Sequence, residues 1–422
     1  MTSTPPIAQP APPPRSTDLG RLWVLMATAF LDMVGALMVI PLLPFYADNL
    51  GASKIAVGVL VSSFSAAQLL SAPLWGRVSD RYGRKPTLLI GLGASVVAYV
   101  IFAFAESYWL LLASRIVQGG GGGTVGVIQA YVADAVEPRK RSRALGWLSA
   151  STNVGVVLGP VIGSAAARWG MHAPGLLAAA LALVNMFFAS RFLRESHGDE
   201  ARKKAKRARS PWNTAVRVLV HAGEPPSRLI WIYAVAIGSF YGVNFVLVFF
   251  LQQQFGVNEA TIGFFFAYIG GLSVVIRIGL LGWVVDKLGE PRTVRLGAVF
   301  LSLGLALTPF TTSLPVLAIT VACIPLGTAF SFPAVTALLS QVIGDHERGV
   351  YMGVQQTYGG IMRVLYPLYA GWAFDFFQGA KVPFLTSAAL VLSTLLLGRK
   401  MENYQGGGRD AAEYRQTQGR TV

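Results

Sequence analysis

The chain has 422 residues, of which 53% are apolar and only 13% charged, and its mean hydropathy is +0.53. Soluble domains carry about 25% charged residues, so this composition excludes a disordered protein and a soluble enzyme of ordinary composition. The net charge is +15, and the single cysteine, Cys323, cannot form an intrachain disulfide. The composition predicts a protein that crosses a membrane many times.

Twelve apolar runs follow a proline-rich stretch, residues 1–20, that is expected to be a disordered tail. A bilayer core needs about 20 apolar residues per helix. The runs are Leu22–Tyr46, Ala56–Gly76, Thr87–Ala105, Tyr108–Ala133, Ala144–Ala167, Ala173–Ser190, Leu229–Leu251, Ala260–Val285, Leu296–Phe310, Leu314–Ile343, Val350–Phe374 and Val382–Gly398. The first run is too long for a cleaved signal peptide. We therefore expect an all-α membrane protein with twelve transmembrane helices.

The distribution of Lys and Arg predicts that both termini are cytoplasmic. In that orientation the five inside loops hold 22 of these residues, whereas the outside loops hold three, Lys54, Arg168 and Lys381. The one long loop, residues 191–228, divides the spans six and six. Its basic run Arg202–Arg209 is expected to face anionic lipid headgroups, not nucleic acid.

The two sets of six spans repeat one another. The loop after the second span, GRVSDRYGRKPT, contains Gly76, Asp80 and Gly83, and the loop after the eighth, GWVVDKLGEPRT, contains Gly282, Asp286 and Gly289 at an offset of 206 residues. Gly146 and Pro160 have counterparts in Gly353 and Pro367 within one residue of that offset. The sequence therefore predicts two pseudo-symmetric six-helix bundles, residues 21–193 and 229–398, joined by a cytoplasmic basic linker, 194–228, and followed by a polar tail, 399–422.

The loop after the second span is expected to hold the cytoplasmic side shut. Asp80 can lie against a helix N-terminus of the other half, while Arg81, Arg84 or Lys85 meets Asp134 at the end of span 4. The alternative is that these residues only add positive charge to an inside loop. The second copy has Glu290 in place of Arg84 and Gln341 near the place of Asp134, so its latch should be weaker.

Few charged side chains lie inside the spans, where each costs at least ~2.5 kcal/mol. Asp32 is the only acid well inside a span, so it is the leading candidate if a membrane side chain carries a proton. A permanent structural ion pair is the alternative role. Arg115, Arg277 and Arg363 leave the pathway positive, which favours an anionic or zwitterionic substrate. Arg363 is central enough to face the cavity, whereas Arg277 can also reach the membrane surface.

Span 5 places Gly155, Gly159 and Gly163 four residues apart on one helix face. Such a face lets another helix approach closely, and Pro160 should kink the helix. Packing of small residues with no further role is the alternative reading.

Four motifs together resemble those of the major facilitator superfamily, in its twelve-span drug:proton antiporter branch, and more loosely those of bacterial tetracycline efflux proteins. GRVSDRYGRKP is similar to the superfamily signature after span 2, and RIVQG, Arg115–Gly119, to a span 4 motif. The span 5 antiporter motif is matched by Gly146, Gly155, Gly159, Pro160 and Gly163, with Ser164 in place of its last glycine. Span 1 has the acid and proline pair of drug-efflux proteins in Asp32, Pro41 and Pro44.

The resemblance implies alternating access driven by a proton gradient, with no cofactor and no metal. It implies Arg115 as the partner of Asp32, with Gln118 beside it in the substrate cavity. The expected function is proton-coupled efflux of small amphipathic, drug-like or anionic compounds by a monomer in a bacterial inner membrane. Uptake or facilitated transport of an organic anion or metabolite stays open.

A membrane-embedded enzyme is disfavoured, because no histidine lies in the middle of a span and only one acid does. Gly121, Gly123 and Gly126 spell a dinucleotide fingerprint, but they lie inside an apolar span without a preceding strand.

Overall fold

The computed structural model describes residues 17–122, 124–136, 138–193, 195, 211–344, 347–399 and 401–407, and the regular structure of these residues is helical. The N-terminal half contains α1 (Thr17–Val39), α2 (Leu43–Asn49), α3 (Lys54–Tyr82), α4 (Arg84–Ala103), α5 (Tyr108–Gly121), α6 (Thr124–Ala135), α7 (Pro138–Ala167) and α8 (His172–Phe192). The C-terminal half contains α10 (Pro211–Val220), α11 (Pro225–Phe255), α12 (Ile262–Val275), the π-helix η1 (Ile276–Leu280), α13 (Leu281–Leu307), η2 (Thr308–Phe310), α14 (Leu314–Val342), α15 (Arg348–Phe376), α16 (Lys381–Leu397) and η3 (Met401–Gly407).

The twelve expected spans map onto these helices in order. Span 1 is α1 with α2, span 4 is α5 with α6, and span 8 runs through α12, η1 and the first part of α13, whose remainder is span 9. Eight helical stretches meet a strict criterion of length and hydropathy for crossing a membrane. One of them, residues 262–310, is long enough to hold two spans, α16 is slightly short, and α5 and α6 are each too short alone. The remaining span, α15, carries Arg363 and several other polar side chains.

The internal repeat is visible in the backbone. Gly83 has φ +106° and ψ 163°, and its counterpart Gly289 has φ +74° and ψ 163°. Positive φ is strained for residues with a side chain, so glycine is needed at both tight turns. The hydroxyls of Thr87 and Thr293 each donate to the carbonyl of that glycine at 2.8 Å. The signature loop thus has the same local structure in both halves.

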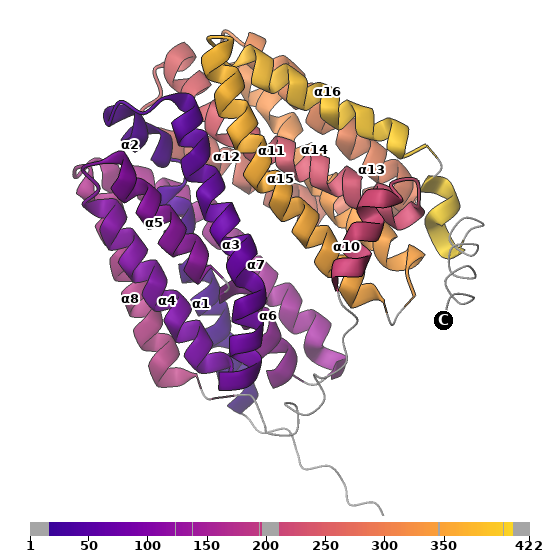
Figure 1. Cartoon of the computed structure of the whole chain (residues 1–422), viewed down its shortest axis with the longest axis horizontal. Coiled ribbons are helices and arrows are strands. Elements are labelled where there is room, and N and C mark those ends of the chain that lie inside the picture. Colours follow the sequence, from indigo (N-terminus) through magenta and orange to yellow (C-terminus); the bar gives the residue numbers. More distant parts are fainter. Residues whose placement is uncertain are drawn as a thin grey trace, which may run out of the picture.

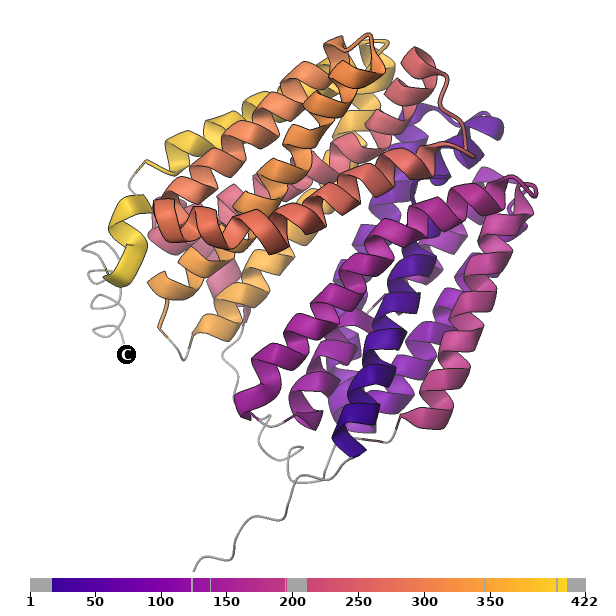
Figure 2. The same cartoon turned by 180° about the vertical axis from the view of Figure 1, so that it is seen from behind.

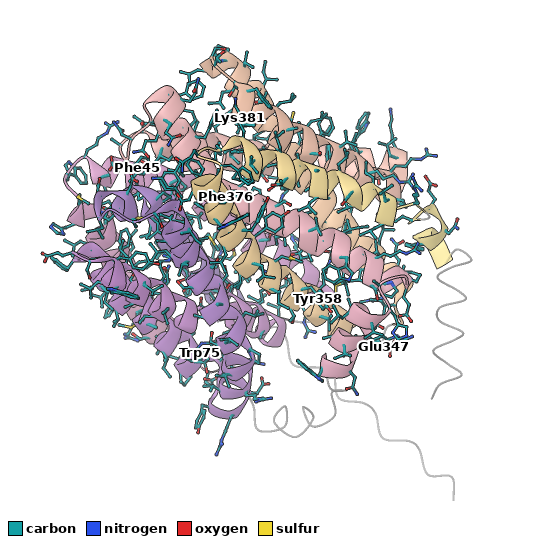
Figure 3. All side chains as sticks on the ribbon, turned by 45° about the horizontal axis from the view of Figure 1, so that its top comes forward. Phe45, Trp75, Glu347, Tyr358, Phe376 and Lys381 are labelled. Atoms are coloured by element: carbon teal, nitrogen blue, oxygen red, sulfur yellow. The ribbon has the colours of Figure 1, made fainter. Side chains whose placement is uncertain are left out.

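The two halves meet at one end of the molecule. Helix α3 packs against α15, and α7 packs against α12. Both contacts lie toward the end formed by residues 50–53, 168–171, 256–261 and 377–380, here called the closed end. Figures 1 and 2 show the halves converging there and diverging toward the other end, where α3 turns into α4 and α8 ends, here called the linker end. In Figure 3, Phe45 and Phe376 lie near the closed end, whereas Trp75 and Glu347 lie toward the linker end.

A helix inside the expected linker was not anticipated. Val218 of α10 is fully buried in a cluster with residues of α11, and the carbonyl of Ala215 accepts a hydrogen bond from the Tyr358 hydroxyl at 2.9 Å. Arg217 forms an ion pair with Glu224 at 2.8 Å. Helix α10 is therefore attached to the C-terminal half. Residues 196–210, with the whole basic run, lie outside the described residues, as do 1–16.

Candidate functional site

Asp32 lies in α1, and α7 packs closely against this helix. A side chain at Gly155 would come within 2.8 Å of the Phe30 carbonyl, and one at Gly159 within 2.8 Å of the Val34 carbonyl. Gly163 packs in the same way on Met38. The predicted close-packing face of span 5 is confirmed, and its partner is the helix that carries Asp32. Gly146 of the same motif faces open space.

Span 4 is interrupted beside Asp32. Helix α5 ends at Gly121 and α6 begins at Thr124, so carbonyl groups near the break lack helical partners. Side chains of α3 donate to three carbonyls at the break: the Gln68 amide to Gly122 at 3.2 Å, the Ser71 hydroxyl to Gly119 at 3.3 Å, and the Trp75 indole to Gly120 at 2.5 Å. The Gly119 carbonyl also accepts from the Gly122 N–H at 3.0 Å. Discontinuous helices of this kind line the ion and substrate sites of many transporters.

The first residue after the break contacts the acid directly. The Thr124 hydroxyl donates to Oδ2 of Asp32 at 2.9 Å, and among the described residues Asp32 forms no ion pair. Asp32 is therefore held by a neutral donor from the second segment of a broken helix. Protonation of this carboxyl would alter the hydrogen bond that joins α1 to α6.

Arg115 does not pair with Asp32 in this conformation, contrary to expectation. Its Nη1 donates to Oε1 of Gln118 at 2.5 Å, and the Gln118 amide donates to the Tyr99 hydroxyl at 3.0 Å. The guanidinium also lies over the Phe64 ring, 4.8 Å from its centroid, and its Nε is buried without a partner. Arg115 as a whole is only 2% exposed. Gln118 is buried beside Arg115, and its place in a substrate cavity stays a prediction.

The C-terminal half contributes two further arginines. Arg363 of α15 donates from Nε to the Gly359 carbonyl at 3.3 Å and lies 5.5 Å from the Tyr241 ring centroid. Arg277 lies in the π-helix η1, partly buried, and its Nε has no partner. Neither guanidinium forms an ion pair with a described carboxylate. π-Helical turns are uncommon and occur often at functional sites, because they turn a side chain out of the regular helical position.

Among the described residues, the hydrogen bonds and the ion pair of the gating loop lie within its own half. Arg84 forms an ion pair with Asp80 at 2.8 Å, and the Lys85 ammonium donates to the Ser190 carbonyl at 2.6 Å. Glu195 accepts from the backbone N–H groups of Arg84 and Lys85 at 2.9 and 3.1 Å, so an acid from the start of the linker caps α4. The side chain of Asp134 lies outside the described residues. The contact of Asp80 with the other half therefore stays a prediction for a state closed at the linker end.

The second copy of the loop differs as expected. Gln341 donates to Glu290 at 3.1 Å, so the two positions that replace Arg84 and Asp134 lie together. Asp286 is exposed. Gly76 and Gly282 have open space where a side chain would lie, so no helix approaches them closely here.

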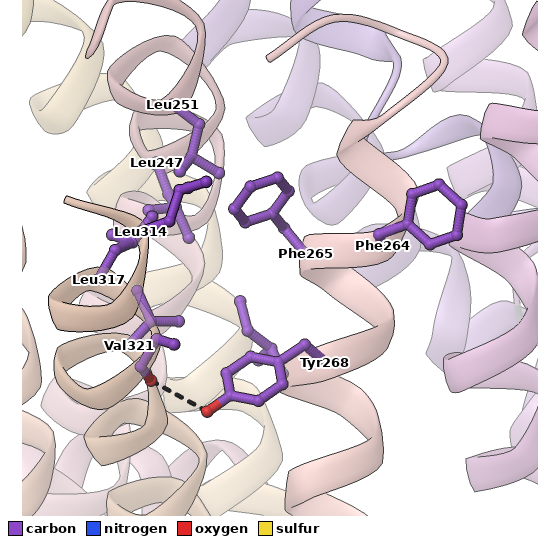
Figure 4. Close-up of a pocket in the computed structure, with 10 residues that line it drawn as sticks. Leu247, Leu251, Phe264, Phe265, Tyr268, Leu314, Leu317 and Val321 are labelled. Atoms are coloured by element: carbon purple, nitrogen blue, oxygen red, sulfur yellow. Dashed lines mark hydrogen bonds between the residues drawn. The ribbon is translucent and has the colours of Figure 1, made fainter. Parts of the chain in front are cut away.

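An apolar pocket lies away from these residues. It has a volume of about 220 Å³ between α11, α12 and α14, and Leu247, Phe265 and Val321 line it (Figure 4). The Tyr268 hydroxyl donates to the Ala318 carbonyl at its edge, at 3.0 Å. No charged residue lines this pocket. It is therefore unsuited to an anion.

Sequence reasoning missed Thr124, the α3 side chains at the break and Tyr99. A run of five glycines, Gly119–Gly123, was the signal for an interruption of span 4, since glycine is unfavourable within helices. The hydroxyl that follows such a run is a natural candidate for the start of the next helical segment.

Comparisons with known proteins agree with this architecture. The sequence profile of the Major Facilitator Superfamily matches residues 25–367. The class C tetracycline resistance protein of Escherichia coli is 30% identical over 82% of this chain and 88% of its own length. Multidrug resistance protein 2 of Bacillus subtilis is 29% identical over 83% of this chain and 88% of its own length.

Solved structures share the fold. The human organic anion transporter MFSD10 (TETRAN) has 24% sequence identity and a TM-score of 0.68, with 92% of this chain and 100% of that chain covered. A bacterial homologue of the human lysosomal transporter Spinster, in an inward-facing and occupied conformation, has 14% identity and a TM-score of 0.76, with 92% and 97% covered.

Proposed function

Because the chain belongs to the Major Facilitator Superfamily, and is thus a multi-pass membrane transporter and not an enzyme, we propose that it exports organic anions or zwitterions in exchange for protons. The observation that carries this proposal is the unbalanced positive charge inside the spans. Arg277 and Arg363 form no ion pair with a described carboxylate. A buried charge without a partner is costly, and a negative group on the substrate would offset that cost.

Asp32 is the proposed proton carrier. Its carboxylate has one hydrogen-bond donor, Thr124, and lies among membrane helices, so loss or gain of a proton changes its interactions strongly. Arg115 lies in the same half and is held by Gln118, so it adds a fixed positive charge to that half. Substrate and proton then compete for one positively charged pathway. Drug resistance proteins among the relatives are consistent with export.

The transport cycle is proposed to be alternating access by a monomer in the inner membrane. The loop charges favour a cytoplasmic linker end, with both termini on that side. The structure would then be in an inward-facing state, which is also the state named for the Spinster homologue. Substrate would enter from the cytoplasm between the diverging halves.

Proton release tests the assignment of Asp32. Tetracycline and a panel of organic anions are added to detergent-solubilised protein in weak buffer, and the released protons are measured for wild type and Asp32→Asn. We expect release from wild type only, because the amide has no proton to exchange. An equal signal from both proteins would move the coupling role to another group.

Arg363→Gln separates recognition from coupling. This variant should bind anionic and zwitterionic compounds about tenfold more weakly, since it loses a charge-assisted contact, and should bind neutral compounds almost as wild type does. Uptake, the second candidate function, is favoured if everted vesicles fail to accumulate any compound of the panel while right-side-out vesicles do.

A further inference from the structure

The closed end is built from two equivalent contacts between the halves. A side chain at Gly58 of α3 would meet the Pro367 carbonyl of α15 at 2.5 Å, and one at Gly263 of α12 would collide with the Pro160 carbonyl of α7. The two glycines are 205 residues apart and the two prolines 207, which is close to the offset of the internal repeat. Each contact therefore places a glycine of one half on the proline turn of the other.

An acid of the C-terminal half caps a helix of the N-terminal half at the first contact. Oδ2 of Asp375 accepts from the backbone N–H of Ile55 at 2.8 Å, and its Oδ1 accepts from that of Lys54 at 3.2 Å. The next two N–H groups of α3 are satisfied by Ser53, through its hydroxyl and its carbonyl. Asp375 and the Ser53 hydroxyl thus satisfy the N–H groups of Lys54, Ile55 and Ala56, and the Val57 N–H makes the first regular helical bond, to the Ser53 carbonyl.

The same corner holds a second interaction across the halves. The Lys54 ammonium pairs with Asp48 of its own half at 2.5 Å and lies 4.0 Å from the centroid of the Phe249 ring of α11. Gly371, one turn before Asp375, lets α15 approach α3 so closely that a side chain there would meet the Lys54 carbonyl at 2.5 Å.

At the second contact the halves are joined by a hydroxyl. The Ser164 hydroxyl of α7 accepts from the backbone N–H of Gly263 at 2.8 Å, next to the start of α12. The side chain is only 2% exposed. Ser164 stands where the antiporter motif has its last glycine. The serine therefore provides a hydrogen bond between the halves that a glycine side chain could not provide.

We propose that Asp375 and Ser164 are the two latch residues that hold the closed end shut, and that the transport cycle opens this end by breaking both caps. The inference rests on the proposed alternating-access cycle. A carboxylate at a helix N-terminus is stabilised by the helix dipole and by charge-assisted hydrogen bonds, whereas a hydroxyl gains only an ordinary hydrogen bond. Asp375 should therefore contribute more to the closed state than Ser164.

Two cysteine reporters on one face of α3 measure the balance of states. Gly58, Ser62 and Leu69 contact α15, and helical spacing puts Ser65 and Ala72 on the same face. Ser65 is buried and Ala72 is exposed. Ser65→Cys should react with a thiol reagent only when the closed end opens, while Ala72→Cys reports on the linker end. Both are made in a Cys323→Ser background, since Cys323 is the single native cysteine.

Asp375→Asn should raise the labelling rate of Ser65→Cys about five- to tenfold without raising that of Ala72→Cys. Ser164→Ala should raise it about threefold. Glu106→Gln is the matched control, because Glu106 is an exposed acid in the α4–α5 loop at the same end. It should leave both rates unchanged.

An unchanged Ser65→Cys rate in both latch variants overturns the proposal. So does a parallel rise of both reporters, which indicates a loosened fold and not a shift between states. The measurement uses neither substrate nor proton gradient. It can therefore fail while export of organic anions is upheld, and it can succeed if that export is not found.

Discussion

At the scale of single residues, the proposed coupling site consists of one carboxylate, Asp32, and one hydroxyl, Thr124, joined by a hydrogen bond between α1 and α6. Asp32 could be predicted because a carboxylate inside a span is costly and rare. The contact of Asp32 with Thr124 could not be predicted, because it depends on how α1 packs among its neighbours. The spacing of Gly155 and Gly159 predicted a close-packing face but not that α1 is its partner. Arg115 likewise donates a hydrogen bond to Gln118, three residues further along its own helix, in this conformation.

The Thr124 hydroxyl should matter for coupling more than for folding. Thr124→Val keeps the branched shape but removes the donor to Asp32, so we expect transport driven by a pH gradient to fall about tenfold. Thr124→Ser retains a hydroxyl and should transport nearly as wild type does. The rates are measured in proteoliposomes with an imposed pH gradient, alongside thermal unfolding of each protein. Equal rates for the valine and serine variants would contradict the role of the hydrogen bond.

At the scale of helices, the length of the apolar runs predicted the spans well. They failed where one span is made of several pieces. The break between α5 and α6 is stabilised by hydrogen bonds from Gln68, Ser71 and Trp75 of α3. Contacts with another helix cannot be recognised in the hydropathy of the span 4 run. The π-helix around Arg277 is equally invisible, because one extra residue in a turn does not change hydropathy.

The glycines of the break are not equivalent, and two of them form a matched pair. A methyl group at Gly119 would come within 2.9 Å of the Ala67 side chain and still closer to the Phe64 carbonyl, whereas Gly120 has open space. Gly119→Ala should therefore destabilise the protein by about 1–3 kcal/mol, and Gly120→Ala should not. Thermal unfolding in detergent compares the two. A lower midpoint for the Gly120 variant than for the Gly119 variant would show that α3 and α5 are packed differently.

At the scale of the whole molecule, the repeat predicted two related halves but not how they are placed. The signature loops have matching turns at Gly83 and Gly289, as identical spacing required. Which end is closed is decided by a few contacts, among them those of Asp375 and Ser164, and a transporter must keep the free energies of its states similar. A sequence that specifies two states cannot reveal which of them is observed.

The orientation predicted from loop charge can be checked in intact cells. Asn49 lies at the closed end and should be outside, while Lys206 falls in the basic run and should be inside. Asn49→Cys should react with a membrane-impermeant thiol reagent added from outside, and Lys206→Cys should react only after the cells are permeabilised. The reverse pattern would invert the topology and, with it, the direction of the proposed export.

The attachment of α10 to the C-terminal half determines how the two halves are tethered. Leu193 and Glu195 are held by the N-terminal half, so residues 196–210 are the part of the chain that links the two halves. Fifteen residues can span at most about 50 Å. A break in the polypeptide within residues 196–210 would leave α10 with Tyr358 and Glu224, whereas a break after His221 would detach it from Glu224. Two separately made fragments that divide the chain within residues 196–210 would therefore each contain all the helices of one half, and α10 would stay with the C-terminal half.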